Sequence, residues 1–119
     1  MAMRDLSGAV DFTVLERMTG GDDAVTLEVL DLFVDQTRLW TPLLDVAHEG
    51  WRDALHTLRG ASAGIGASLL AEVCLQVEGL ASSEAAPGLQ RVLSALNQAL
   101  ADVAAYRHGL MLRSLSRQD

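Results

Sequence analysis

The sequence predicts an all-α protein, an antiparallel up-down-up-down four-helix bundle with a short extra N-terminal helix. Half of the 119 residues are hydrophobic, but aromatic residues make up only 4%. This excess of Leu, Ala and Val over aromatic side chains favours helix packing over a β-sandwich. Apolar residues recur at helical spacing in four long segments, and short connections between such segments favour antiparallel neighbours. We expect one domain over residues 1–119, with an ordered core at about 11–112.

Capping residues mark the first two helices. Residues 1–10 show no helical pattern, and we expect them to be weakly ordered. Asp11 is a candidate N-cap for a short helix over 12–18, which Thr19-Gly20-Gly21 should end because glycine tolerates the left-handed conformation. The acidic pair at 22–23 then supplies cap oxygens and negative charge for the second helix.

The second helix should be long and interrupted at Pro42. Proline has no N–H to donate and crowds the carbonyl of Arg38, so we expect a kink there, or a break with Thr41 capping a new start. Residues 48–50 should close the element. Its expected apolar stripe consists of Leu27, Leu30, Phe33, Val34, Trp40, Leu44 and Ala47.

Three more helices follow from the apolar pattern. One should run from 51 to Gly64–Gly66, and the next over about 67–81. A polar loop containing Pro and Gly is expected at 82–88. The last helix should extend for about 25 residues, roughly 37 Å, before a polar tail at 113–119 that we expect to fray. The apolar positions are Leu69, Leu70, Val73, Val77 and Leu80 in the first of these stripes, and Leu89, Val92, Leu93, Leu96, Leu100, Val103 and Leu110 in the second.

Composition limits the possible partners and compartment. The net charge is −7, and all nine basic residues are Arg, so nucleic acid is not an expected partner. The single cysteine, Cys74, excludes an internal disulfide and fits a reducing compartment. No apolar run is long enough to span a bilayer, and the N-terminus lacks the apolar core of a secretory signal. We therefore expect a cytoplasmic protein.

A histidine stands out on the helix that begins at Trp51. At about 100° per residue, the apolar residues of this helix gather on the side opposite His56. The residues within roughly 60° of His56 are Arg52, Arg59, Gly60 and Ala63. His56 should therefore face solvent, flanked by two guanidinium groups and two residues of small size.

This surrounding suits phosphoryl transfer through the ring. A neutral imidazole is a nucleophile near neutral pH, and Gly60, one turn on, leaves space for a tetrahedral phosphoryl group. A positioned cation stabilises the charge on the equatorial oxygens in transfer, with Arg59 the first candidate and Arg52 the second. The alternative is that both arginines are ordinary solvated surface residues.

The pattern His56, Arg59, Gly60 and Gly66 resembles the histidine-containing phosphotransfer (HPt) domain, supported by Leu70, Cys74 and Glu78 on the next helix. The family pattern is a histidine, two residues, a lysine and a glycine, with a second glycine ten residues after the histidine. Arg59 departs from the usual lysine. The resemblance implies His56 as phosphoacceptor, and Glu78 as the carboxylate that accepts from Nδ1–H and leaves Nε2 free to attack.

The resemblance also implies the partners. We expect response-regulator receiver domains and the receiver domains of hybrid histidine kinases, docking through Arg52, Gly60 and Ala63. The chain itself should hold no cofactor, with Mg²⁺ on the partner receiver domain, and it should be a monomer. No nucleotide-binding signature is present, so we expect no ATP-dependent kinase activity.

Other readings of the same residues stay open. Asp53 is an alternative polar neighbour of His56. Two Asp-x-x-His pairs suggest a metal site, which the outward direction of His56 disfavours. At the level of function, the alternatives are a receiver-docking module that no longer transfers phosphate and a plain helical scaffold.

Overall fold

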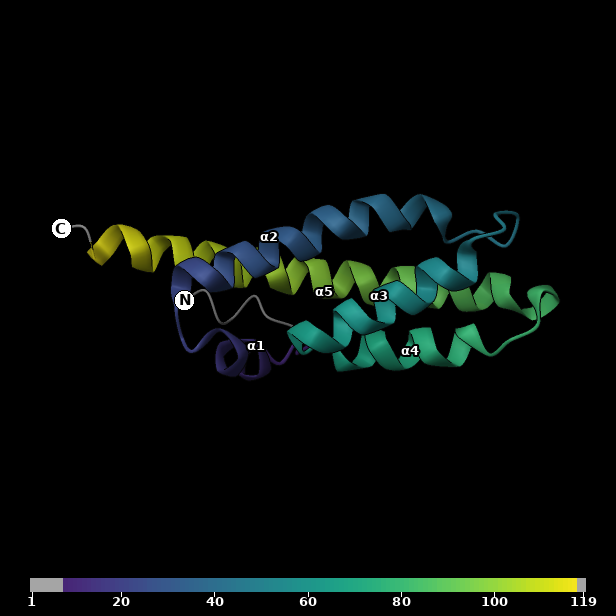
Figure 1. The fold of residues 1–119 in the computed structure, drawn as a ribbon, viewed down its shortest axis with the longest axis horizontal. Helices are drawn as coiled ribbons and strands as arrows, with labels where there is room; N and C mark the ends of the chain where they lie inside the picture. The colour runs from purple at the N-terminus through teal and green to yellow at the C-terminus, as the bar shows by residue number, and fades with distance from the viewer. Residues whose placement is uncertain (1–7, 118–119) are drawn as a thin grey trace.

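The computed structural model describes residues 8–117, and within this range the protein is all-helical, with five α-helices and no β-strand. Four long helices, α2 (Asp23–Trp40), α3 (Trp51–Ile65), α4 (Ser68–Glu78) and α5 (Ser82–Arg117), lie along the long axis of the molecule (Figure 1). Each contacts its neighbours in a ring, with α2 against α3, α3 against α4, α4 against α5 and α5 against α2. The short α1 (Phe12–Thr19) contacts α2 and α3. No helix in the described range has an apolar stretch long enough to cross a lipid bilayer.

The caps expected for the first two helices are confirmed. The Asp11 carboxylate accepts from the Thr13 N–H, and α1 ends on Gly20 at a left-handed φ of 67°. The Asp22 carboxylate accepts from the first two N–H groups of α2 that follow Asp23. Of the N-terminal residues expected to be weakly ordered, 1–7 lie outside the described residues, whereas Val10 is buried in the core.

The break at Pro42 is confirmed, but the helix does not resume after it. A single 3-10 turn, η2 (Thr41–Leu43), follows α2, and a loop leads to α3. In this loop Asp45 Oδ1 accepts from the Ala47 N–H, and His48 Nδ1 accepts from the Gly50 N–H. Because these side chains take backbone donors that a helix would use, they favour the irregular path. The expected core position of Ala47 is therefore wrong, since Ala47 is exposed.

The extent of α3 is as predicted, while α4 is shorter than the expected 67–81. Gly66 ends α3 at a φ of 88°, and α4 stops at Glu78. The buried face of α4 is centred on Leu70, so Leu69, about 100° away on the helix, is 51% exposed. The prediction that Leu69 lies in the core is wrong.

The expected loop at 82–88 is also wrong, because these residues form the start of α5. This helix has 36 residues rather than about 25, with Pro87 inside it. Gly88 lies where α5 packs against the end of α4. A Cβ at Gly88 would lie 2.8 Å from Val77 Cγ2, so the glycine permits a close contact with the end of α4. The tail expected to fray is helical to Arg117, and residues 118–119 lie outside the described range.

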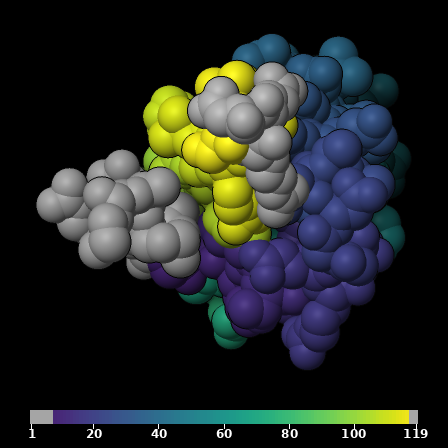
Figure 2. All heavy atoms as spheres, turned by 90° about the vertical axis from the view of Figure 1, so that its left-hand side faces the viewer, coloured from purple at the N-terminus to yellow at the C-terminus, as the bar shows by residue number. Residues whose placement is uncertain are grey.

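At one end of the molecule, α1 and α2 meet the C-terminal part of α5 (Figure 2). The Tyr106 ring stacks on Phe12 with centroids 4.0 Å apart, and its hydroxyl donates to the Glu16 carboxylate. Burial, followed by this hydrogen bond, raises the pKa of Tyr106 to about 12. Arg113 forms an ion pair with Asp23 at 2.9 Å. These contacts fasten α5 to the two N-terminal helices.

Candidate functional site

His56 projects from α3 into solvent, with its side chain 63% exposed. The opposite side of α3 is packed into the core. Its buried residues are Trp51, Ala54, Leu55, Leu58, Ser62 and Ile65. The helix is therefore amphipathic in the sense that the sequence predicts, and the imidazole lies on its outward face.

The Glu78 carboxylate, at the last residue of α4, lies against the imidazole. Glu78 Oε1 is 2.8 Å from His56 Nδ1. The Arg59 guanidinium joins them, with Nε donating to Glu78 Oε2 at 3.1 Å and Nη2 lying 3.0 Å from His56 Nδ1. The sequence pointed to Glu78 as a neighbour of the histidine, but it gave no sign that Arg59 pairs with Glu78.

The two contacts at Nδ1 require opposite protonation states. Glu78 can accept only if Nδ1 carries the hydrogen, whereas Arg59 can donate only if Nδ1 presents its lone pair. With Nδ1 deprotonated, a carboxylate would face a lone pair at 2.8 Å, which is repulsive. With Nδ1 protonated, Arg59 keeps its Nε bond to Glu78, and its Nη groups can donate to water instead. The geometry thus favours the Nδ1–H tautomer, with the lone pair on Nε2.

Arg52 is half-buried and is bound within the protein rather than presented to solvent. Its Nη1 donates to the backbone carbonyl of Glu78 at 2.8 Å, and its Nη2 lies 3.5 Å from Ser82 Oγ. The guanidinium also lies over the Trp51 ring, 4.3 Å from the centroid. Arg52 therefore joins α3 to the end of α4 and the start of α5.

Gly60 and Ala63 lie on the exposed side of α3. A Cβ at Gly60 would meet no atom within 4 Å, so the space beside the histidine is open. A shallow apolar groove of about 170 Å³ runs between α2 and the α3 residues Ala61 and Gly64. Met18 and Leu32 line it and are 57% and 56% exposed. These two residues were not singled out from the sequence, although both fall outside the apolar stripes that mark the core.

Two further residues to consider are Cys74 on α4 and Asp53 on α3, three residues before His56. Cys74 is fully buried, and burial raises the pKa of its thiol to about 12, with the Glu78 charge adding to the effect. The buried thiol of Cys74 is therefore inert. The backbone carbonyl of Asp53 accepts from the Thr57 hydroxyl.

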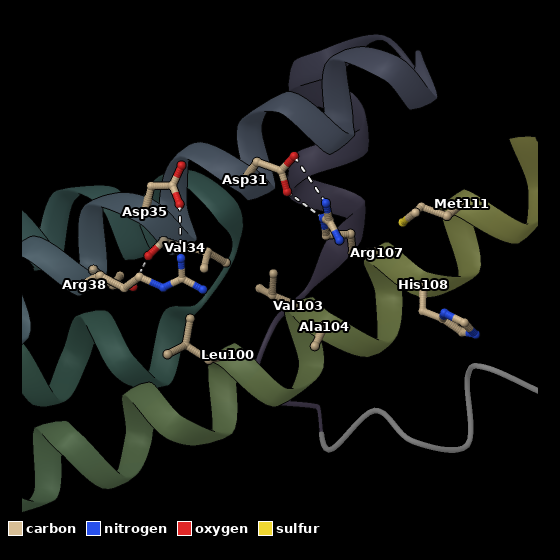
Figure 3. A pocket seen from close by; sticks show the side chains of 11 residues that line it. Asp31, Val34, Asp35, Arg38, Leu100, Val103, Ala104, Arg107, His108 and Met111 are labelled. Carbon is tan, nitrogen blue, oxygen red and sulfur yellow. Dashed lines mark hydrogen bonds and ion pairs between the residues drawn. The ribbon is translucent and has the colours of Figure 1, made fainter.

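A larger groove, of about 740 Å³, lies between α2 and α5 (Figure 3). Its floor is apolar, and ion pairs between Asp31 and Arg107 and between Asp35 and Arg38 border it. None of its lining residues belongs to α3 or α4, so it is separate from the imidazole, the carboxylate and the two arginines described above.

Known proteins resemble this chain in sequence and in fold. The sequence matches the Hpt domain family over residues 28–106. The fold is similar to the crystal structure of the histidine phosphotransferase ShpA from Caulobacter crescentus, with a TM-score of 0.80 and 50% sequence identity over 91% of this chain and 99% of that one. No curated protein matches the sequence significantly. The chain therefore belongs to the Hpt domain family, whose members act in phosphorelays.

Proposed function

We propose that this protein is the intermediate of a multistep phosphorelay. His56 accepts a phosphoryl group from the aspartate of one receiver domain and passes it to the aspartate of another. The body that carries it is a single cytoplasmic domain, an antiparallel up-down-up-down four-helix bundle with α1 as an extra helix. The observation that carries the proposal is an exposed imidazole whose Nδ1 lies 2.8 Å from a carboxylate, in a chain of the Hpt family.

In the proposed uptake step, the Nε2 lone pair of His56 attacks the phosphorus of the aspartyl phosphate. The N–P bond forms while the bond from phosphorus to the aspartate oxygen breaks, and the aspartate leaves as a carboxylate. The ring then carries phosphate on Nε2 and hydrogen on Nδ1, so it is cationic. Glu78 stabilises that cation through a charge-assisted hydrogen bond, which is roughly twice as strong as a neutral one. Delivery to the second aspartate is the reverse of these bond changes.

Arg59 is the proposed contact for the phosphoryl oxygens. Its Nε bond to Glu78 holds the guanidinium beside the ring, and protonation of Nδ1 leaves Nη2 without an acceptor there. A small movement of the whole guanidinium toward a phosphoryl group on the ring would supply positive charge to the equatorial oxygens. We propose that Mg²⁺ and the acidic residues of the reaction come from the receiver domain.

The receiver should dock on the outward faces of α3 and α2. Gly60 and Ala63 leave room around the imidazole, and the apolar groove lined by Met18 and Leu32 lies on the α2 side of the same helix. We expect this interface to belong to the small, transient class. Such an interface permits the fast release that a relay requires, and we propose that the protein acts as a monomer.

The test is transfer from a receiver domain carrying labelled aspartyl phosphate. We expect acid-labile, base-stable label on the protein, and its loss in His56→Gln. His108→Gln is the matched control, because His108 is exposed on α5 outside the site, and it should keep the label. Label that persists in His56→Gln would contradict the assignment of the phosphoacceptor.

A docking module without transfer is the second candidate. It is favoured by Arg59, which stands where the family usually has lysine and which is engaged by Glu78. Receiver binding without any label on the protein would select this candidate. Neither binding nor label would leave a helical scaffold.

A further inference from the structure

The orientation of the imidazole depends on Glu78, and Glu78 depends in turn on where α4 ends. We propose that Arg52 is a positioning residue for phosphoryl transfer, which acts by fixing the last residue of α4 and so the carboxylate that holds His56 Nδ1. This role rests on the function proposed above. It differs from the docking role expected for Arg52 from the sequence.

The backbone contact of Arg52 falls at a helix end. Glu78 is the final residue of α4, and the last carbonyls of a helix have no intrahelical partner. Arg52 Nη1 donates to the Glu78 carbonyl at 2.8 Å. A cation at this position also interacts favourably with the negative end of the helix dipole. Arg52 therefore caps α4 from a neighbouring helix.

The guanidinium is itself held in place. Trp51, which is only 4% exposed, provides a fixed ring beneath it at 4.3 Å. Ser82, the first residue of α5, lies 3.5 Å from Nη2. Because these neighbours belong to α3 and α5, the packing of those helices fixes the position of Arg52 and, through it, the end of α4.

The backbone carbonyl and the side-chain carboxylate of Glu78 are therefore each held by an arginine. Arg52 binds the backbone carbonyl, and Arg59 binds the side-chain oxygen Oε2 at 3.1 Å, which leaves Oε1 directed at His56 Nδ1. Arg52 precedes His56 by one helical turn, and neither of its hydrogen bonds is to the ring. Its removal should loosen the last turn of α4, weaken the Nδ1–H···Oε1 bond and reduce the preference for the reactive tautomer.

The direct readout is the imidazole tautomer of His56, measured from ring ¹⁵N chemical shifts, which requires no phosphoryl transfer. We expect Arg52→Gln to lower the Nδ1–H fraction, and Arg52→Lys to restore part of it. The rate of phosphoryl uptake should fall about tenfold in Arg52→Gln, equivalent to about 1.4 kcal/mol. Arg113→Gln is the matched control, because Arg113 joins two helices at the Asp23 ion pair without contacting Glu78. It should change neither quantity.

A double-mutant cycle separates positioning from general destabilisation. If Arg52 acts through Glu78, then Arg52→Gln should have little further effect on the tautomer or the rate in a Glu78→Ala background. Additive effects, or an unchanged tautomer in Arg52→Gln, would overturn the proposal. If Arg52→Gln does not fold, the same comparison is made with Arg52→Lys. If the wild-type protein takes up no label, the relay function fails, while the tautomer measurement still decides the role of Arg52.

Discussion

Substitution of Gly66 by alanine should destabilise the protein by about 3 kcal/mol. Gly66 has a φ of 88°, a conformation that costs a residue with a Cβ about 1–2 kcal/mol. A Cβ there would also lie 2.2 Å from the carbonyl oxygen of Asp11. The two backbones must separate, which breaks the 2.9 Å bond from the Asp11 N–H to the Gly66 carbonyl, a loss of about 1 kcal/mol.

Urea and thermal unfolding followed by circular dichroism measure this effect. At about 4 °C per kcal/mol for a domain of this size, the midpoint should fall by roughly 12 °C. Gly64→Ala is the matched control, since Gly64 lies inside α3 and a Cβ there meets nothing within 4 Å. That variant should be about 0.5–1 kcal/mol more stable. A Gly66→Ala protein within about 1 kcal/mol of wild type would refute the reasoning.

Three further outcomes are expected. Gly60→Ala should leave the free energy of unfolding unchanged or raise it by about 0.5–1 kcal/mol. It should nevertheless slow phosphoryl uptake from a receiver, because a methyl group enters the open space beside His56. An unchanged initial rate would rule out a role for Gly60 in leaving this space open. Cys74, with a thiol pKa of about 12, should resist iodoacetamide at pH 8 in the folded protein and react once urea unfolds it; rapid labelling under native conditions would contradict its burial. The folded pKa of Tyr106, about 12, lies above its ordinary value of 10, so its contribution to stability is present below pH 10 and is lost as pH rises through 12. Tyr106→Phe should lose less stability than wild type between pH 9 and 11 in urea unfolding, and identical pH slopes would argue against this assignment.

Local signals predicted the helix ends near the N-terminus but not the start of α5. The ends of α1 and the start of α2 follow from carboxylates and glycines that act on neighbouring backbone groups, so the sequence alone predicts them. The start of α5 does not, because Pro87 and Gly88 have the composition of a turn. At Gly88 the helix lies so close to Val77 of α4 that a Cβ would clash, and tertiary packing can override local preference.

Some features of the candidate site were also predictable from local signals, and others were not. The outward direction of His56 follows from helical periodicity, since every large apolar residue of α3 lies on the other side. The proximity of Glu78 came only from the family resemblance. The bond from Arg52 to the Glu78 carbonyl was not predictable, because periodicity gives the face of a residue but not the register at which two helices pack.

The imidazole, its carboxylate and both arginines all belong to one continuous stretch of chain, the hairpin formed by α3 and α4. The apolar groove also takes Ala61 and Gly64 from α3, but its exposed large apolar residues, Met18 and Leu32, belong to α1 and α2. If a receiver docks on this groove as proposed, Met18 and Leu32 can diverge without disturbing the residues around His56. An engineer could retarget the protein to a different receiver by exchanging exposed residues of α2 while leaving the hairpin untouched.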